Sequence, residues 1–175
     1  MIRTVLLLII AITILVGLGS LAMAKQNGAH DKQANASQKG TFSVLGSEVD
    51  GRPLIAIIDM GLRNSPDRQH LPFFLSLSTP LISPTSDGLP TKNDADSLNT
   101  WEDAMEARLR PIGKFVFVGR VTWNGNRELL YYVNDPQPAV EVLKKLSDAH
   151  STRPFAFRCN RDEKWDKANF WFNHK

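Results

Sequence analysis

The sequence has few of the features that would assign a chemistry to it. Its 175 residues contain one cysteine, Cys159, so no disulfide can form within the chain. It also lacks the motifs of a nucleophile elbow, a phosphate-binding glycine loop, a dinucleotide site, a zinc-binding H-E-x-x-H helix and a c-type haem attachment. These absences exclude the enzyme classes that such motifs mark. We therefore expect no catalytic residues, no metal site and no cofactor.

An excess of charge of one sign is also lacking. The chain has 21 Lys and Arg residues against 18 Asp and Glu residues, and residues 1–24 hold one of the arginines and none of the acids. The remaining part therefore has 20 basic and 18 acidic side chains. A domain so close to neutral does not carry the positive surface of a nucleic-acid-binding protein, and we expect no nucleic-acid partner.

A long apolar run is present at the N-terminus. It extends over 20 residues, from Val5 to Ala24, follows the single charge of Arg3, and ends in Ala22-Met23-Ala24. This small-x-small ending is the pattern behind which signal peptidases cut. The run predicts export, with the N-terminus left on the cytoplasmic side and the rest of the chain in the periplasm or secreted.

Two fates of residues 1–24 remain open. Gly17, Gly19 and Ser20 interrupt the run and leave an apolar core of secretory length, which favours a signal peptide cut after Ala24. A run of 20 residues is also long enough to span a bilayer, so that residues 5–24 would tether the domain to the inner membrane if uncleaved. Residues 25–40 contain no large apolar side chain and predict a flexible polar tether before a single domain over residues 41–175.

The domain alternates short strands with two helices. A helix over about 97–110 carries one apolar stripe, and a second begins at Asp135-Pro136, with a capping acid and proline at its first position. The turn signals Asp50-Gly51 and Asn124-Gly125 predict two hairpins. The expected strands cover residues 41–49, 53–59, 73–81, 114–123, 127–133 and 155–159.

From Phe73 onward the order of elements is strand, helix, strand, strand, helix, strand. This order is typical of an α+β, ferredoxin-like βαββαβ fold, an antiparallel sheet with both helices on one face. The preceding hairpin, residues 41–59, would extend the sheet or cover its open face. In the strand 114–123, simple alternation places Phe115, Phe117, Val121 and Trp123 on one face, and Val116, Val118, Arg120 and Thr122 on the other.

Two groups of charged residues are candidates for a site. Arg120, Arg127 and Glu128 surround the second hairpin and are the better candidates for binding an anionic ligand, although a cross-strand ion pair is the simpler explanation. Glu102, Asp103 and Glu106 offer carboxylates for acid–base or metal chemistry. Acids in the early turns of a helix are more often a solvated face that the helix dipole favours.

Several short phrases of the sequence, taken in order, resemble a known bacterial family, the domain of unknown function 695 family. These phrases are Asp50-Gly51-Arg52-Pro53, Asp87-Gly88-Leu89-Pro90, Glu102-Asp103, Val118-Gly119-Arg120, Gly125-Asn126-Arg127-Glu128, Tyr131-Tyr132, and Asp162 with Trp165. The resemblance covers residues 41–172 and implies no established activity. Some relatives are associated with a regulator of the endonuclease RNase E, a cytoplasmic role that the export segment argues against.

These features favour a non-catalytic binding or interaction module outside the cytoplasm, whose partner is an envelope protein or a small ligand. The alternative is an envelope enzyme of the hydrolase type that uses the carboxylates or the Arg/Glu group.

Overall fold

The structure is a computed structural model that describes residues 40–149 and 153–174. The predicted signal segment, its cleavage after Ala24 and nearly all of the predicted tether lie outside these residues. Within the described ranges, no helix combines the length and the apolar character needed to cross a bilayer.

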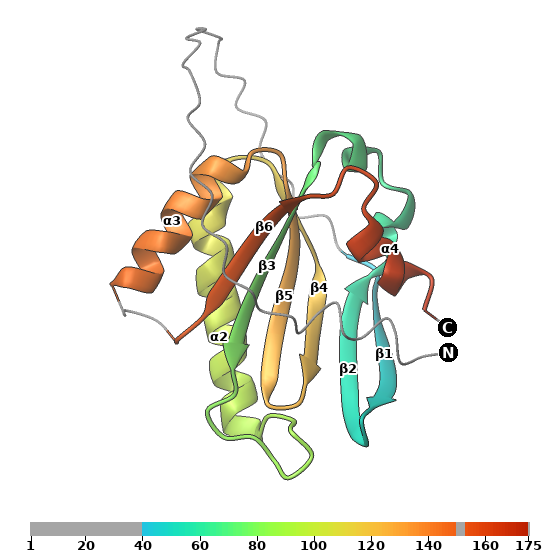
Figure 1. The fold of residues 1–175 in the computed structure, drawn as a ribbon, viewed down its shortest axis with the longest axis vertical. Helices are drawn as coiled ribbons and strands as arrows, with labels where there is room; N and C mark the ends of the chain where they lie inside the picture. The colour runs from blue at the N-terminus through green and yellow to red at the C-terminus, as the bar shows by residue number, and fades with distance from the viewer. Residues whose placement is uncertain (1–39, 150–152, 175) are drawn as a thin grey trace, which may run out of the picture. The chain divides into compact units, whose positions relative to one another are not determined.

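Six antiparallel strands form one sheet in the order β1-β2-β4-β5-β3-β6 (Figure 1). Its strands are β1 Phe42–Val49, β2 Arg52–Asp59, β3 Phe73–Pro80, β4 Phe115–Trp123, β5 Asn126–Val133 and β6 Ala156–Arg161. The other elements of the described residues are η1 Met60–Asn64, η2 Pro66–His70, α2 Lys92–Leu109, η3 Arg110–Ile112, α3 Pro136–Asp148 and α4 Asp166–Phe172. The prediction of a mixed α and β domain with an antiparallel sheet is confirmed. Because β2 pairs with β4, the first hairpin lies in the sheet.

Each face of the sheet has its own core (Figure 1). On one face, α2 and α3 pack on alternate residues of β3 and β5, such as Leu75 and Leu129. On the other face, α4 packs on β2, β4 and β5 through Trp165, Ala168 and Phe172. The apolar stripe predicted for α2 is buried as expected, with Leu98 and Leu109 fully inaccessible.

The first helix begins five residues earlier than the sequence predicts. It starts at Lys92, and the hydroxyl of Thr91 accepts a hydrogen bond from the backbone N–H of Asp94. The apolar stripe begins only at Leu98, so periodicity alone does not reveal the first turn. Threonine is a good N-cap residue, so Thr91 is the local signal for this earlier start.

The C-terminal segment contains a helix that was not predicted, α4, which the Asp162–Trp165 phrase fixes to the sheet. The Tyr132 hydroxyl donates to Asp162 Oδ2 at 2.6 Å, and the Trp165 ring stacks on Tyr132 with centroids 3.8 Å apart. The indole N–H of Trp165 donates to the Leu71 carbonyl at 2.9 Å. This part of the chain is therefore occupied in holding the second core together.

A β-bulge in β4 reverses the predicted faces of its second half. Phe117 pairs with Tyr131, but Gly119 pairs with Leu130, so Val118 is an extra residue in the strand. Phe115 and Phe117 pack in the core on the α2 face, whereas Val121 and Trp123 pack in the core on the opposite face, beneath α4. The prediction that all four share a face was wrong because it assumed uninterrupted alternation.

Gly119 is the residue that permits this bulge. A Cβ atom at this position would lie 2.2 Å from the Ile57 carbonyl oxygen of the neighbouring strand. No side chain fits there unless β2 and β4 separate. The close approach of the two strands therefore requires glycine.

We predict that Gly119→Ala lowers the free energy of unfolding by about 2 kcal/mol or more, because the methyl group forces the strands apart. Urea denaturation of the full chain measures the change. Gly46→Ala is the matched control, since Gly46 lies on β1 with open space around its Cβ position. Its effect should stay within about 0.5 kcal/mol. Equal effects of the two substitutions would contradict this account of the bulge.

Candidate functional site

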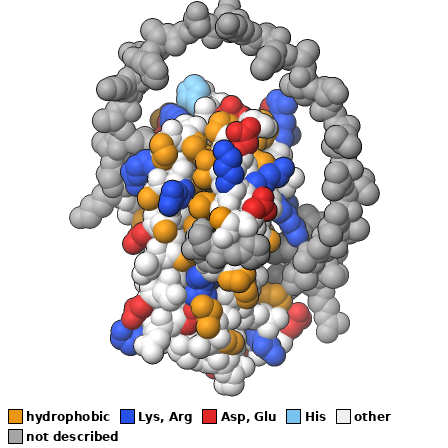
Figure 2. Space-filling view, turned by 90° about the vertical axis from the view of Figure 1, so that its left-hand side faces the viewer, with side chains coloured by type: hydrophobic (Ala, Val, Ile, Leu, Met, Phe, Trp, Pro, Cys, Tyr) orange, Lys and Arg blue, Asp and Glu red, His pale blue; other side chains and the backbone are white. Residues whose placement is uncertain are grey.

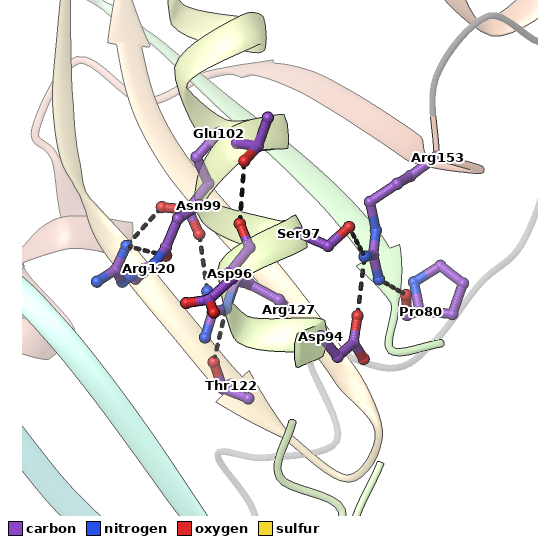
Figure 3. A network of polar contacts seen from close by, with 11 residues as sticks. Pro80, Asp94, Asp96, Ser97, Asn99, Glu102, Arg120, Thr122, Arg127 and Arg153 are labelled. Atoms are coloured by element: carbon purple, nitrogen blue, oxygen red, sulfur yellow. Dashed lines mark hydrogen bonds and ion pairs between the residues drawn. The ribbon is translucent and has the colours of Figure 1, made fainter. Parts of the chain in front are cut away.

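A buried carboxylate lies between two arginines on the α2 face of the sheet (Figure 3). Glu102, on α2, is 7% exposed. Its Oε2 accepts from Arg120 Nη1 at 2.6 Å, and its Oε1 accepts from Arg127 Nη1 at 2.9 Å. Both oxygens of the carboxylate are therefore engaged, and a single acid is shared by two guanidinium groups.

The strands bring the two arginines to this face by register. Arg120 on β4 pairs with Leu129 of the α2-side core, and Thr122 pairs with Arg127 of β5. The Thr122 hydroxyl accepts from Arg127 Nε at 3.0 Å, which fixes the guanidinium plane toward Glu102. Arg120 reaches α2 only because the bulge turns it to this face.

A second buried ion pair secures the N-terminal turn of α2. Arg153 Nη1 donates to Asp94 Oδ1 at 2.8 Å and to the Ser97 hydroxyl, while Arg153 Nη2 donates to the Pro80 carbonyl (Figure 3). The other oxygen of Asp94 accepts from the Ser83 N–H at 3.0 Å. Burial raises the pKa of Asp94, but these hydrogen bonds and the charge of Arg153 outweigh burial and leave its pKa below the usual value. Asp94 therefore has a structural role.

The two arginines of the first cluster line a hollow of about 220 Å³. The other lining residues come from β2, β4 and the loop before α2; they are Ile55, Ile57, Thr122, Leu89 and Pro90. Most of this wall is apolar. The lining of the hollow is therefore positively charged on one side and apolar elsewhere.

The Asp87–Pro90 phrase supplies one wall of the hollow because it is tied to the second hairpin turn. The Gly125 N–H donates to the Gly88 carbonyl at 2.9 Å, and the Leu81 N–H donates to the Gly125 carbonyl at 2.8 Å. Gly88 has a φ of +78°, and a Cβ there would lie 3.0 Å from Asn124 Cα. Glycine is thus required where this loop crosses the turn and places Leu89 and Pro90 over β2.

Positive charge exceeds negative charge at this site. Burial lowers the pKa of Arg127, and the attraction of Glu102 opposes that change while Arg120 adds to it. Guanidinium groups remain protonated under all ordinary conditions, so Glu102 leaves one positive charge uncompensated in the cluster. Among the described residues, the buried Nε of Arg120 has no hydrogen-bond partner.

The structure brings only some of the predicted site residues together. Arg120 and Arg127 are adjacent, but Glu128 lies on the opposite face, where its surroundings include Ser76, Arg158 and Lys167. Burial raises the pKa of Glu128, which the hydrogen bond with Ser76 partly opposes. The simpler explanation was an ion pair between neighbouring strands. Among the described residues, the acid paired with Arg127 is instead Glu102, which lies on α2.

The three acids of α2 have separate environments, so they do not form a carboxylate cluster. Glu102 is buried against the arginines, which corrects the view of this group as a solvated face, whereas Asp103 is exposed. Glu106 is half-buried, and burial raises its pKa although Arg110 opposes this. Across residues 40–149 and 153–174, no three His, Cys, Asp or Glu side chains are grouped as a metal site requires.

Sequence reasoning missed the link between Glu102 and the arginines, and it missed the apolar wall of the hollow. The one local signal was Gly119 in the middle of a strand, a position where glycine often marks a bulge. A bulge there predicts that Arg120 changes face, and thus that it meets the helix that follows β3.

We predict that Glu102→Gln lowers the free energy of unfolding by about 3 kcal/mol, because it leaves two guanidinium groups without their counter-charge. Asp103→Asn is the control, since it removes the same charge one residue away at an exposed position, and its effect should stay within about 0.5 kcal/mol. Urea denaturation of both variants gives the comparison. A loss below 1 kcal/mol for Glu102→Gln would show that the carboxylate does not balance the arginines.

Comparison with known protein families gives a match over most of the chain. The profile of a family described as "Family of unknown function (DUF695)" matches residues 42–172. No curated protein and no solved structure matches the chain. The matched range extends from β1 to the last residue of α4 and includes every residue that lines the hollow. It covers well over half of the sequence, so the chain belongs to the DUF695 family.

Proposed function

We propose that this protein is a non-catalytic binding domain outside the cytoplasm, whose hollow at Arg120 and Arg127 takes a small group with one negative charge. The observation that carries the proposal is the shared acid: two arginines face the hollow, and among the described residues Glu102 is the one carboxylate paired with them. A bound anion would restore charge balance.

The chemistry of the arginines supports this ligand class. A guanidinium group presents N–H donors in a planar fork that matches a carboxylate or a phosphate. Arg127 uses Nε and Nη1 for Thr122 and Glu102, and Arg120 uses Nη1 for Asn99 and Glu102. Arg120 is 29% exposed in its side chain, so it is the more accessible of the two. We propose that Arg120 contacts the ligand and that Arg127 holds Glu102 in place.

The size and lining of the hollow support binding over catalysis. Its volume of about 220 Å³ lies below the range typical of pockets for drug-sized ligands, so it holds a small group or one end of a longer molecule. No Asp, Glu, His or Cys is among the described residues that line it. The alternative, an envelope hydrolase, would need a free base there, and both oxygens of Glu102 already accept hydrogen bonds from arginine.

The location outside the cytoplasm rests on the apolar run and cleavage pattern of residues 1–24. That location makes an envelope protein or a small envelope ligand the accessible partner. The proposed exclusion of nucleic acid is supported by the surface charges, because Figure 2 shows basic and acidic side chains interspersed over the side where α3 lies. A membrane contact would come from residues 5–24 if they are not removed.

For the fold, we propose that β3 to β6 with α2 and α3 form the ferredoxin-like βαββαβ arrangement and that the β1–β2 hairpin is added to it. Strand order supports this: along the sheet, β4-β5-β3-β6 are the second, third, first and fourth strands of that unit. Both helices of the unit pack against the same core.

We predict that acetate shifts the side-chain Nε–H resonance of Arg120 in ¹H–¹⁵N spectra of the full chain, with millimolar affinity. Sodium chloride at equal ionic strength is the control for screening. Arg120→Gln should abolish acetate binding, read from the backbone N–H resonances of the neighbouring residues of β4, whereas Arg110→Gln, at an arginine whose side chain is 57% exposed, should preserve it. If acetate and chloride act alike on the unmodified chain, the hollow is not an anion site.

We also predict that the protein from fractionated cells has a mass that begins at Lys25 in the soluble extracytoplasmic fraction, as cleavage after Ala24 requires. Intact-mass spectrometry of each fraction makes the measurement. A full-length mass in the membrane fraction would replace cleavage with anchoring. A full-length mass in the cytoplasmic fraction would contradict export.

A further inference from the structure

The hollow opens onto an apolar strip of the sheet that no helix of the described residues covers. Register pairing aligns Val44 of β1, Ile57 of β2 and Arg120 of β4 in one row across three strands. Directly paired residues of an antiparallel sheet share a face, so this row lies on the α2 side. Val44 is 71% exposed, and Phe42 beside it is 49% exposed.

This strip is open because the helices of that face end short of it. The core of α2 and α3 is built on β3, β4 and β5, and among its buried members no residue comes from β1 or β2. In the next row, Gly46, Ile55 and Thr122 are aligned, and no atom of the described structure lies within 4 Å of a Cβ placed on Gly46. The result is an apolar floor (Val44, Ile55 and Ile57, with Gly46) that continues from the hollow.

We propose that the ligand of this site is a single-chain amphiphile, a carboxylate with a medium-length acyl chain, an inference that rests on the anion site proposed above. The carboxylate contacts Arg120 in the hollow, and the chain lies across Ile57 to Val44. Three neighbouring strands place Arg120 and Val44 about 10 Å apart. A chain of about eight carbons covers that span.

The floor is suited to an acyl chain and poorly suited to a peptide. The backbone groups of β2 are paired with β1 on one side and β4 on the other, so the part of the floor that lies on β2 presents side chains alone. A peptide laid on it would leave its own N–H and C=O groups without partners, which is unfavourable, whereas methylene groups have no such requirement.

Charge fixes the direction of the chain on the floor. The carboxylate of Asp59, on the same face of β2, lies near Phe42 and accepts from the N–H groups of Thr41 and Gly61. An anionic head is therefore favoured at Arg120 and disfavoured at the Asp59 end of the floor. The acyl chain runs from Arg120 over Ile57 toward Val44 and Gly46.

The experiment titrates the purified full chain with octanoate, acetate and octanol, each below its aggregation concentration, by isothermal titration calorimetry. Octanoate has both parts of the ligand, acetate has the head group alone, and octanol has the chain without the charge. We expect octanoate to bind at least about tenfold more tightly than either, because methylene burial adds to the ion contact. Val44→Thr should weaken octanoate binding about threefold or more without changing acetate binding.

Ile82→Thr is the matched control, since Ile82 is 68% exposed in the loop before α2 and does not line the hollow. It should leave octanoate binding unchanged. Equal affinities for octanoate and acetate, both lost in Arg120→Gln, would overturn the acyl-chain inference and leave the anion site standing. Octanol binding as tight as octanoate, with no effect of Arg120→Gln, would overturn the anion site. Absence of binding by all three would overturn both.

Discussion

The absence of a side chain at Gly119 is the constraint on which the site depends. The Ile57 carbonyl oxygen occupies the space that a Cβ would need, so β4 approaches β2 closely and accommodates Val118 as an extra residue. This bulge exchanges the two faces of the strand beyond it. Val121 and Trp123 therefore complete the core beneath α4, and Arg120 faces α2. One backbone irregularity determines both the packing of one core and the charge of the opposite face.

The buried charges follow from that exchange. Glu102 would be an unpaired buried acid without the arginines, and the arginines would repel each other without Glu102. Hydrogen bonds from Arg120 and Arg127 to Glu102, and from Arg127 to Thr122, hold the cluster together, and it retains one positive charge beside an apolar floor. This charge and lining support the anion site proposed above, and no Asp, Glu, His or Cys is among the described residues that line the hollow.

The elements that could be predicted from sequence are those with local signals. Asp135 and Pro136 cap α3 as expected, and Asn124-Gly125 forms the turn between β4 and β5 with both residues at positive φ. The early start of α2 depends on the cap at Thr91, and α4 depends on tertiary packing. The spacing of apolar residues in the sequence indicates neither. The candidate site could be predicted only as two arginines near a hairpin. The partnership with Glu102 and the face on which Arg120 lies depend on the bulge, which strict alternation of side chains along β4 does not predict.

The central claim is that Arg127 holds Glu102 in place while Arg120 contacts the ligand. Double-mutant cycles with Glu102 test this claim most directly. Urea unfolding of the single and double Gln variants gives a coupling energy for each pair. We expect the Glu102–Arg127 coupling, between side chains 10% and 9% exposed, to exceed the Glu102–Arg120 coupling, in which Arg120 is 29% exposed. A larger coupling for Arg120, or no coupling for either pair, would contradict the proposal that Arg127 holds the acid and Arg120 receives the ligand.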